Sequence, residues 1–186
     1  MSDPIQLIEK FVHAFGRFDS EVSYADSTLA RLVEDDGFVP KIHKVISPPS
    51  VLESLYDRLP FRLPPLYEHL ILSYRWPQVD LETYTLLANP LGPDLSGLYG
   101  ELSRDGCLWD ALVPAGYLQF GKGPDIDYDP VCFEMKSRGK NRECRIVKID
   151  HEEILCNYRV KVVAELAPSF EMLVHRTIEA AEMKRP

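Results

Sequence analysis

The sequence predicts a single α+β domain: N-terminal helices, then a central, mostly antiparallel sheet, then a closing C-terminal helix. Three observations support this class. Apolar residues recur at helical spacing in the first part of the chain, and from residue 79 onward the period shortens to that of strands. Two later strand-like segments are joined by a short loop, which favours antiparallel pairing. The length of 186 residues suits one domain with its own core.

Helices dominate the predicted first half. Asp3 and Pro4 favour a helix start, and an apolar face at helical spacing continues to Gly16. A short helix is expected over residues 27–33, followed by an edge strand or extended arm over residues 38–46. We expect residues 1–45 to form a helical extension packed on a core domain of residues 46–186.

Proline breaks divide the beginning of this core domain. Breaks at residues 47–50 and 63–65 predict helices over residues 52–59 and 66–74, and Pro77 stops the second one. The alternating apolar residues between 79 and 87 then predict a strand.

Short helices and strands are predicted for the second half. Asp94 is expected to cap a helix that carries Leu95, Leu98 and Leu102, and a shorter helix follows at Leu108. Strands are predicted over residues 116–120, 130–135 and 145–149, with a hairpin loop over residues 136–141. Residues 158–166 favour a further strand, and Ser169 is expected to cap the closing helix.

The composition is that of an acidic globular protein. Its net charge of −8 disfavours nucleic-acid binding, because phosphates require a basic surface. The sequence contains no apolar run long enough to cross a bilayer, and no signal peptide is expected. The four cysteines are widely spaced, so we expect them to be reduced and mostly buried in a cytoplasmic protein.

Three alternating aspartates resemble part of a calcium-binding loop. Asp125, Asp127 and Asp129 have the right spacing, but such loops also need glycine at the sixth position and glutamate at the twelfth. Pro130 and Lys136 occupy those places. We therefore expect a solvated turn whose aspartates cap backbone N–H groups, with no metal or cofactor.

His151 and the cysteines suggest two further kinds of chemistry. Cys132, Cys144, His151 and Cys156 lack the close pairs that structural zinc sites use. Asp150 beside His151 invites a Cys–His–Asp nucleophilic site. Neighbours on a strand point to opposite faces, however, so Asp150 is poorly placed to orient His151. We expect both residues to end a strand, with Asp150 capping the turn that follows.

A basic stretch interrupts this acidic chain. It contains Arg138, Lys140, Arg142, Arg145 and Lys148, without the interleaved aromatic residues that stack on nucleic-acid bases. A charged hairpin tip that aids solubility is the simpler interpretation, and contact with an acidic partner is the alternative.

Several segments resemble the SUKH superfamily, which is named for Smi/Knr-type regulators. Residues 63–70, LPPLYEHL, resemble the helix that opens the family core. Residues 116–121 and 128–133 resemble middle strands of its bacterial members, and residues 167–171 resemble the entry to its closing helix. The resemblance spans roughly residues 50–180. It departs from the family pattern at residues 74–77, YRWP, where an Asn-Gly type of helix ending is expected.

The resemblance implies a non-catalytic binding domain with no catalytic residues to transfer. Bacterial members resemble immunity proteins that neutralise polymorphic toxins, whereas fungal relatives regulate cell-wall synthesis. The acidic charge favours a basic toxin as the protein partner, and a regulatory scaffold without a toxin is the related alternative. The expected contact residues lie in two exposed loops: Lys122, Asp125, Asp127, Tyr128, Arg138 and Lys140. An alternative of a different class is a small hydrolase that uses Asp125, Asp127 and Glu134 or the Cys/His set.

Overall fold

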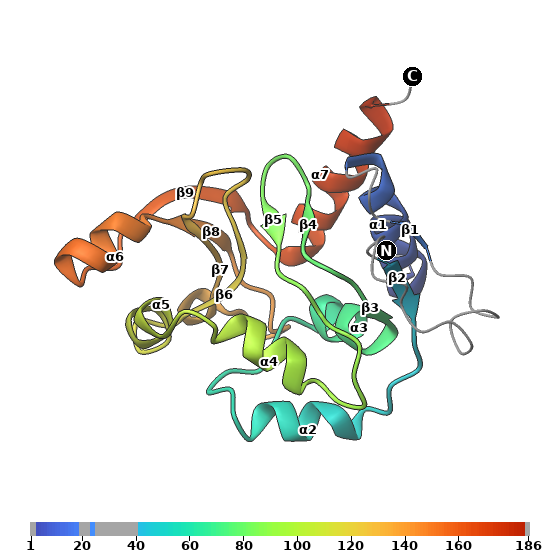
Figure 1. The fold of residues 1–186 in the computed structure, drawn as a ribbon, viewed down its shortest axis with the longest axis horizontal. Helices are drawn as coiled ribbons and strands as arrows, with labels where there is room; N and C mark the ends of the chain where they lie inside the picture. The colour runs from blue at the N-terminus through green and yellow to red at the C-terminus, as the bar shows by residue number, and fades with distance from the viewer. Residues whose placement is uncertain (1–2, 19–22, 25–40, 185–186) are drawn as a thin grey trace.

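The computed structural model of the chain describes residues 3–18, 23–24 and 41–184. Among these residues, an antiparallel sheet carries helices on both faces, as Figure 1 shows. The predicted α+β class is confirmed.

The main sheet has six strands in the order β4-β5-β6-β7-β8-β9. Every strand pairs antiparallel with the next one along the chain, so all pairings are between sequence neighbours. The strands are β4 (Val79–Asp80), β5 (Thr85–Leu86), β6 (Tyr117–Lys122), β7 (Pro130–Glu134), β8 (Ile146–Ile149) and β9 (Val162–Ala167). A smaller sheet joins β1 (Ser23–Tyr24), β2 (Lys41–Lys44) and β3 (Tyr74–Arg75).

The larger core lies on one face of the main sheet and is rich in aromatic rings. Phe120 of β6 stacks on Phe133 of β7 with ring centroids 4.1 Å apart, and Tyr67 meets both rings edge-on. Phe11 and Phe170 extend this group from the covering helices. Those helices are α1 (Pro4–Phe18), α3 (Pro65–Ser73) and α7 (Phe170–Met183). The N-terminal helix therefore shares its core with the rest of the chain.

A second, smaller core lies on the opposite face. Side chains of α5 and α6 pack there on Tyr117, Cys132 and Val147 of the sheet. The remaining helices are shorter, and α4 contacts β6. Their bounds are α2 (Ser50–Tyr56), α4 (Ser96–Leu102), α5 (Gly106–Leu112), η1 (Met135–Ser137, a 3₁₀ turn) and α6 (His151–Asn157).

Most predicted elements are present, and the predicted cap of the closing helix is confirmed. Ser169 caps α7 by accepting a hydrogen bond from the backbone N of Met172 at 3.1 Å. The predicted cap at Asp94 is wrong: the N-cap of α4 is Leu95, without a side-chain cap bond, and Asp94 accepts from the backbone N of Ser96 in the turn before the helix. The predicted helix over residues 27–33 lies outside the described residues, as do residues 38–40 of the predicted edge strand.

The predicted strand over residues 79–87 is wrong, because this segment is the hairpin of β4 and β5. The carboxylate of Asp80 accepts from the backbone N of Glu82, which adopts a left-handed φ of 70°. Leu81 donates its backbone N–H to the carbonyl of Tyr84, which closes the turn. Leu81 is buried and keeps the spacing of Val79, so the sequence alternation runs on into the turn and hides it.

The segment after β8 also differs, because it forms helix α6 rather than a turn. The helix has seven residues, of which only Ile154 is buried. A single buried position gives no apolar period from which a helix is predicted. Tyr158 ends the helix in the left-handed conformation, with a φ of 52°.

Candidate functional site

A pocket with a volume of about 410 Å³ opens beside α5 and α6, and we call it the α5–α6 pocket. Its volume falls in the range of small-molecule sites. Apolar and polar side chains share its wall: Gln78, Leu87, Glu101, Arg104, Asp105, Leu108, Gln119, Lys122, Tyr128, His151 and Leu155.

A β-bulge in β6 directs Lys122 into this pocket. Gln119 and Lys122 both line it, although residues three apart on a regular strand face opposite sides. The bulge between Gln119 and Gly121 adds one residue and restores Lys122 to the face of Gln119. A Cβ on Gly121 would lie 2.8 Å from the carbonyl oxygen of Thr85, so glycine is required at this close approach.

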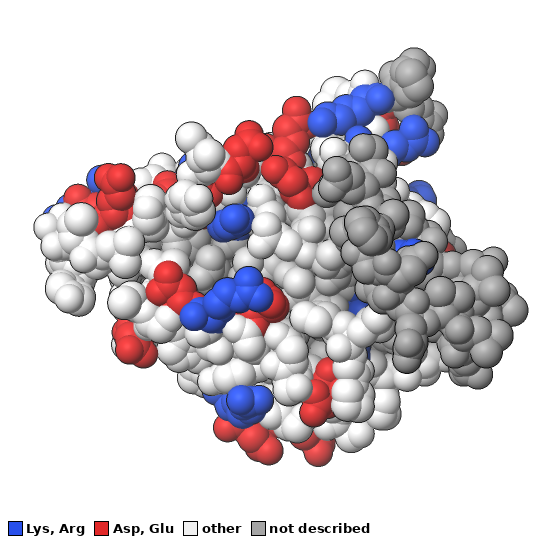
Figure 2. Space-filling model, in the orientation of Figure 1, with Lys and Arg blue, Asp and Glu red and all other residues white. Residues whose placement is uncertain are grey.

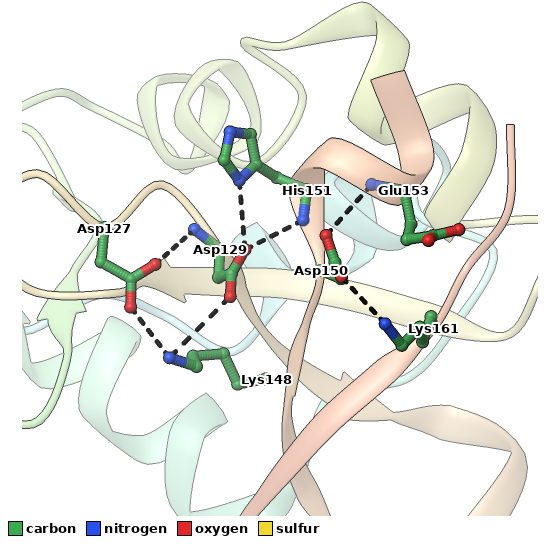
Figure 3. A network of polar contacts seen from close by, with 7 residues as sticks. All are labelled: Asp127, Asp129, Lys148, Asp150, His151, Glu153 and Lys161. Carbon is green, nitrogen blue, oxygen red and sulfur yellow. Dashed lines mark hydrogen bonds and ion pairs between the residues drawn. The ribbon is translucent and has the colours of Figure 1, made fainter. Parts of the chain in front are cut away.

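His151 is oriented by Asp129, which lies just before β7. Oδ1 of Asp129 accepts from the backbone N of His151 at 3.0 Å and lies 3.1 Å from Nδ1 of its ring. Figure 3 shows the second ring nitrogen pointing away from Asp129. When Nδ1–H is donated to the carboxylate, the neutral ring presents Nε2 to the pocket as an acceptor.

Lys148 of β8 connects this carboxylate to Asp127. Its Nζ lies 2.8 Å from Oδ2 of Asp127 and 3.8 Å from Oδ2 of Asp129 (Figure 3). Partial burial is the largest single effect on Asp127 and opposes its charge, but the hydrogen bonds from Lys148 and from the backbone N of Asp129, together with the charge of Lys148, lower the pKa of the carboxyl. The same bond raises the pKa of Lys148. A Cβ on Gly123 would lie 2.1 Å from the carboxyl carbon of Asp127, so only glycine leaves room for this pair.

Asp150 has a structural role that is separate from His151. It caps α6 by accepting from the backbone N of Glu153 at 3.1 Å, and this bond is the main cause of its lowered pKa. Its second oxygen lies 3.3 Å from Nζ of Lys161 (Figure 3). The predicted separation of Asp150 from the His151 ring is thus observed, but the residue caps a helix instead of a turn.

The side chains considered for a metal site or for thiol chemistry do not gather at one site among the described residues. Within residues 3–18, 23–24 and 41–184, no group of three His, Cys, Asp or Glu side chains could hold a metal ion. Cys132 and Cys144 are buried, as expected for most cysteines, but Cys107 and Cys156 are exposed. Burial raises the pKa of the Cys132 thiol and raises that of Cys144 to about 12, which disfavours the nucleophilic thiolate.

The predicted contact residues form two groups at opposite ends of β7. Lys122 ends β6, and Asp125, Asp127 and Tyr128 lie in the loop between β6 and β7, whereas Arg138 and Lys140 lie beyond the far end of β7. At about 3.3 Å per residue, β7 separates the two groups by roughly 16 Å. Arg138 also donates to the carbonyl of Arg62 at 3.3 Å, which ties this connection to the loop before α3. The two groups therefore do not form one patch.

The same separation along β7 argues against the alternative of a hydrolase that uses Asp125, Asp127 and Glu134. Glu134 is buried at the far end of β7, and its Oε2 lies 2.6 Å from Nη2 of Arg145. Asp127, at the near end, is engaged by Lys148, and Asp125 is exposed to solvent. The three groups converge on no common point, so this geometry gives no support to a hydrolase built on them.

Four exposed apolar side chains surround the start of β7 and helix α6. Their exposed fractions are 86% for Ile126, 58% for Tyr128, 49% for Leu155 and 91% for Tyr158. We call these residues the α6 surface. Tyr128 and Leu155 also line the pocket, and the Tyr128 ring lies 6.1 Å from that of His151. In Figure 2 the left end of the molecule, where α6 lies, shows a large uncharged area.

The sequence interpretation missed most of this site. Leu155 and Tyr158 were not identified as contact residues because α6 was not predicted. Asp129 was considered as a metal ligand and as a cap of backbone N–H groups in a turn, but its bonds to His151 were not predicted, although an antiparallel register of β7 and β8 places it near residue 150. That register is set by the hairpin and carries no local sequence motif.

Neither a protein-family model nor a curated protein matches the chain. The resemblance to the SUKH superfamily therefore stays a prediction. No helix within the described part of the chain has the length and apolar character needed to cross a membrane.

Proposed function

We propose that the chain is a non-catalytic protein-binding domain that acts as an immunity protein and neutralises a toxin by direct contact. The observation that carries the proposal is the α6 surface, where four apolar side chains stay exposed and two of them, Tyr128 and Leu155, line the α5–α6 pocket. Exposed apolar groups gathered at one place on a folded domain are typical of interaction sites. Tyrosines are also enriched among the residues that dominate binding energy.

The loop that presents Tyr128 is held in place before any partner arrives. The ion pair of Asp127 with Lys148 and the bonds of Asp129 to His151 fix the residues on both sides of this tyrosine. A contact residue that is already positioned loses less conformational freedom on binding. The polar network around the loop therefore supports a binding role.

The charge of the chain favours a basic partner. The net charge is −8, and the exposed acids Asp125 and Glu152 lie next to the α6 surface in the chain. Long-range attraction between an acidic and a basic protein raises the rate of association and is weakened by salt. A basic toxin fits this charge, and a regulatory partner without toxicity is the alternative within the same class.

The test is to co-express the chain with the protein encoded beside it in its genome, and to titrate the purified pair calorimetrically. Tyr128→Ala and Tyr158→Ala should each weaken binding by about tenfold or more, since truncating a central tyrosine costs about 1.4 kcal/mol or more. Ile46→Ala is the matched control, because Ile46 is fully exposed in the segment between β2 and α2. This control should bind like the wild type.

Two outcomes separate the alternatives. Relief of a growth defect that the neighbour causes by itself would support the immunity role, whereas binding to a harmless neighbour would favour the regulatory scaffold. If the neighbour does not bind, or if Ile46→Ala weakens binding as much as the tyrosine variants, the α6 surface is not its contact site.

A further inference from the structure

Lys122 brings a positive charge to the wall of the α5–α6 pocket. Its Nζ lies 5.4 Å from the centroid of the Tyr128 ring, and none of the ion pairs found between described residues includes it. The acids of the pocket wall are already engaged. Glu101 pairs with Arg104, and Asp105 accepts from the backbone N of Leu108 at 3.0 Å. Asp105 keeps its negative charge, so the wall as a whole is balanced, and Lys122 is the cation of the wall that remains available to pair with an acidic group of a ligand.

His151 adds a hydrogen-bond acceptor at the same pocket. When Nδ1–H donates its hydrogen bond to Asp129, the neutral ring offers Nε2, which has no hydrogen-bond partner among the described residues. An N–H or O–H group of a ligand satisfies this acceptor. The other polar wall residue of the sheet, Gln119, donates to the carbonyl of Gly121 at 3.1 Å, which leaves its side-chain oxygen as a further acceptor.

The apolar part of the wall comes from three different segments. Leu87 follows β5, Leu108 lies in α5, and Leu155 lies in α6. Leu87 and Leu108 are nearly buried at 8% exposure each, so they form the floor of the pocket more than its rim. An apolar floor with a few directional polar groups is the usual composition of a small-molecule site.

We propose that this pocket binds a small organic acid that carries an apolar group and an N–H or O–H donor, such as an N-acylated amino acid. The acidic group pairs with Lys122, the donor reaches Nε2 of His151, and the apolar group lies on Leu87 and Leu108. This site exists in the isolated chain and does not depend on the partner proposed above.

Two features of the backbone show that the charged and polar groups are held in place. The β-bulge, which needs Gly121 close to Thr85, directs Lys122 into the pocket. Asp129 fixes both the backbone and the ring of His151. Binding groups whose positions are fixed by the surrounding structure lose little freedom when a ligand binds.

The test is a titration of the isotope-labelled full chain with N-acetyl-L-leucine and with 3-phenyllactate, followed by amide NMR spectra. We expect saturable shifts at Gln119, Lys122, His151 and Leu155. N-acetyl-L-leucinamide, which lacks the carboxylate, should bind about tenfold more weakly or worse, because an ion-paired hydrogen bond contributes about 1.5 kcal/mol or more.

Matched variants complete the test. Lys122→Gln should lose binding by about tenfold, and His151→Phe by about threefold, on the usual scale of single hydrogen bonds. Lys136→Gln is the control, since Lys136 also lies over a tyrosine ring, 4.3 Å from the centroid of Tyr117, but outside the pocket. The same spectra show whether each variant is folded.

Three results would overturn the proposal. One is the absence of saturable shifts with both acids at millimolar concentration. The second is equal binding of the acid and its neutral amide. The third is a Lys122→Gln variant that is folded and binds as tightly as Lys136→Gln.

Discussion

Replacement of Asp129 tests the polar network that fixes the site. Its carboxylate accepts two hydrogen bonds from His151 and lies 3.8 Å from Nζ of Lys148. Asp129→Ala removes all of these contacts. Hydrogen bonds that involve a charged group contribute about 1.5–3 kcal/mol each, but water reaches a side chain that is 21% exposed and replaces part of them. We therefore expect the free energy of unfolding to fall by about 2 kcal/mol.

Asparagine separates the role of the charge from that of the oxygen atom. Asp129→Asn keeps an acceptor for the backbone N of His151 but loses the charge, so we expect a loss of about 1 kcal/mol. Asp125→Asn is the matched control, because Asp125 is exposed and asparagine also tolerates its left-handed φ of 52°. This control should stay within about 0.5 kcal/mol of the wild type.

The assay is urea unfolding at neutral pH, followed by circular dichroism, with the slope of the transition compared between variants. Asp129→Ala within about 0.5 kcal/mol of the wild type would refute this reasoning. An equal loss of stability in Asp125→Asn would refute it too, because the loss would then follow from removing any negative charge of the loop.

Three further changes probe the loop and the core. Gly123→Ala should lower stability by about 1–3 kcal/mol in urea unfolding, because its Cβ would lie 2.1 Å from the carboxyl carbon of Asp127. The lowered pKa of Asp127 predicts that its pair with Lys148 stabilises fully above pH 3.8 and is lost as the pH falls through the folded-state pKa. The stability difference between Asp127→Asn and the wild type should then shrink below pH 3.8, and a constant difference would contradict it. Phe120→Ala should cost about 3–5 kcal/mol in the same assay, since Phe120 is fully buried and stacked on Phe133.

The fold could be predicted from the sequence where local patterns and tertiary packing agree. Helix α7 was predicted from a serine cap and an apolar face, and the structure shows both. β7 and β8 are short apolar runs joined by a polar loop, which is the usual pattern of a hairpin. In these segments each local preference favours the same structure, so the prediction was correct.

The prediction failed where the apolar pattern carries little local information. Leu81 lies in a tight turn but keeps the alternation of Val79, Thr83, Thr85 and Leu87, so residues 79–87 resemble one strand in sequence although they form a hairpin. Helix α6 buries only Ile154 and shows no helical period. Both elements border the site, since β5 leads to Leu87 and α6 carries His151 and Leu155.

The candidate site was predicted only in part, because contacts between distant segments create it. Lys122 and Tyr128 were expected to be contact residues, and both line the pocket. The partner of His151 was not predicted, since Asp129 is separated from it by the whole β7–β8 hairpin. The bulge that directs Lys122 inward depends on strand register, which no short motif encodes.

The most direct test of the central claim is amide hydrogen exchange of the chain, alone and in complex with the protein encoded beside it. Protein binding through the α6 surface predicts slower exchange in residues 124–129 and 151–158 of the complex. Exchange in the β7–β8 connection, residues 138–143, should stay unchanged. A stable complex that leaves residues 124–129 and 151–158 as exchangeable as in the free chain would contradict the account.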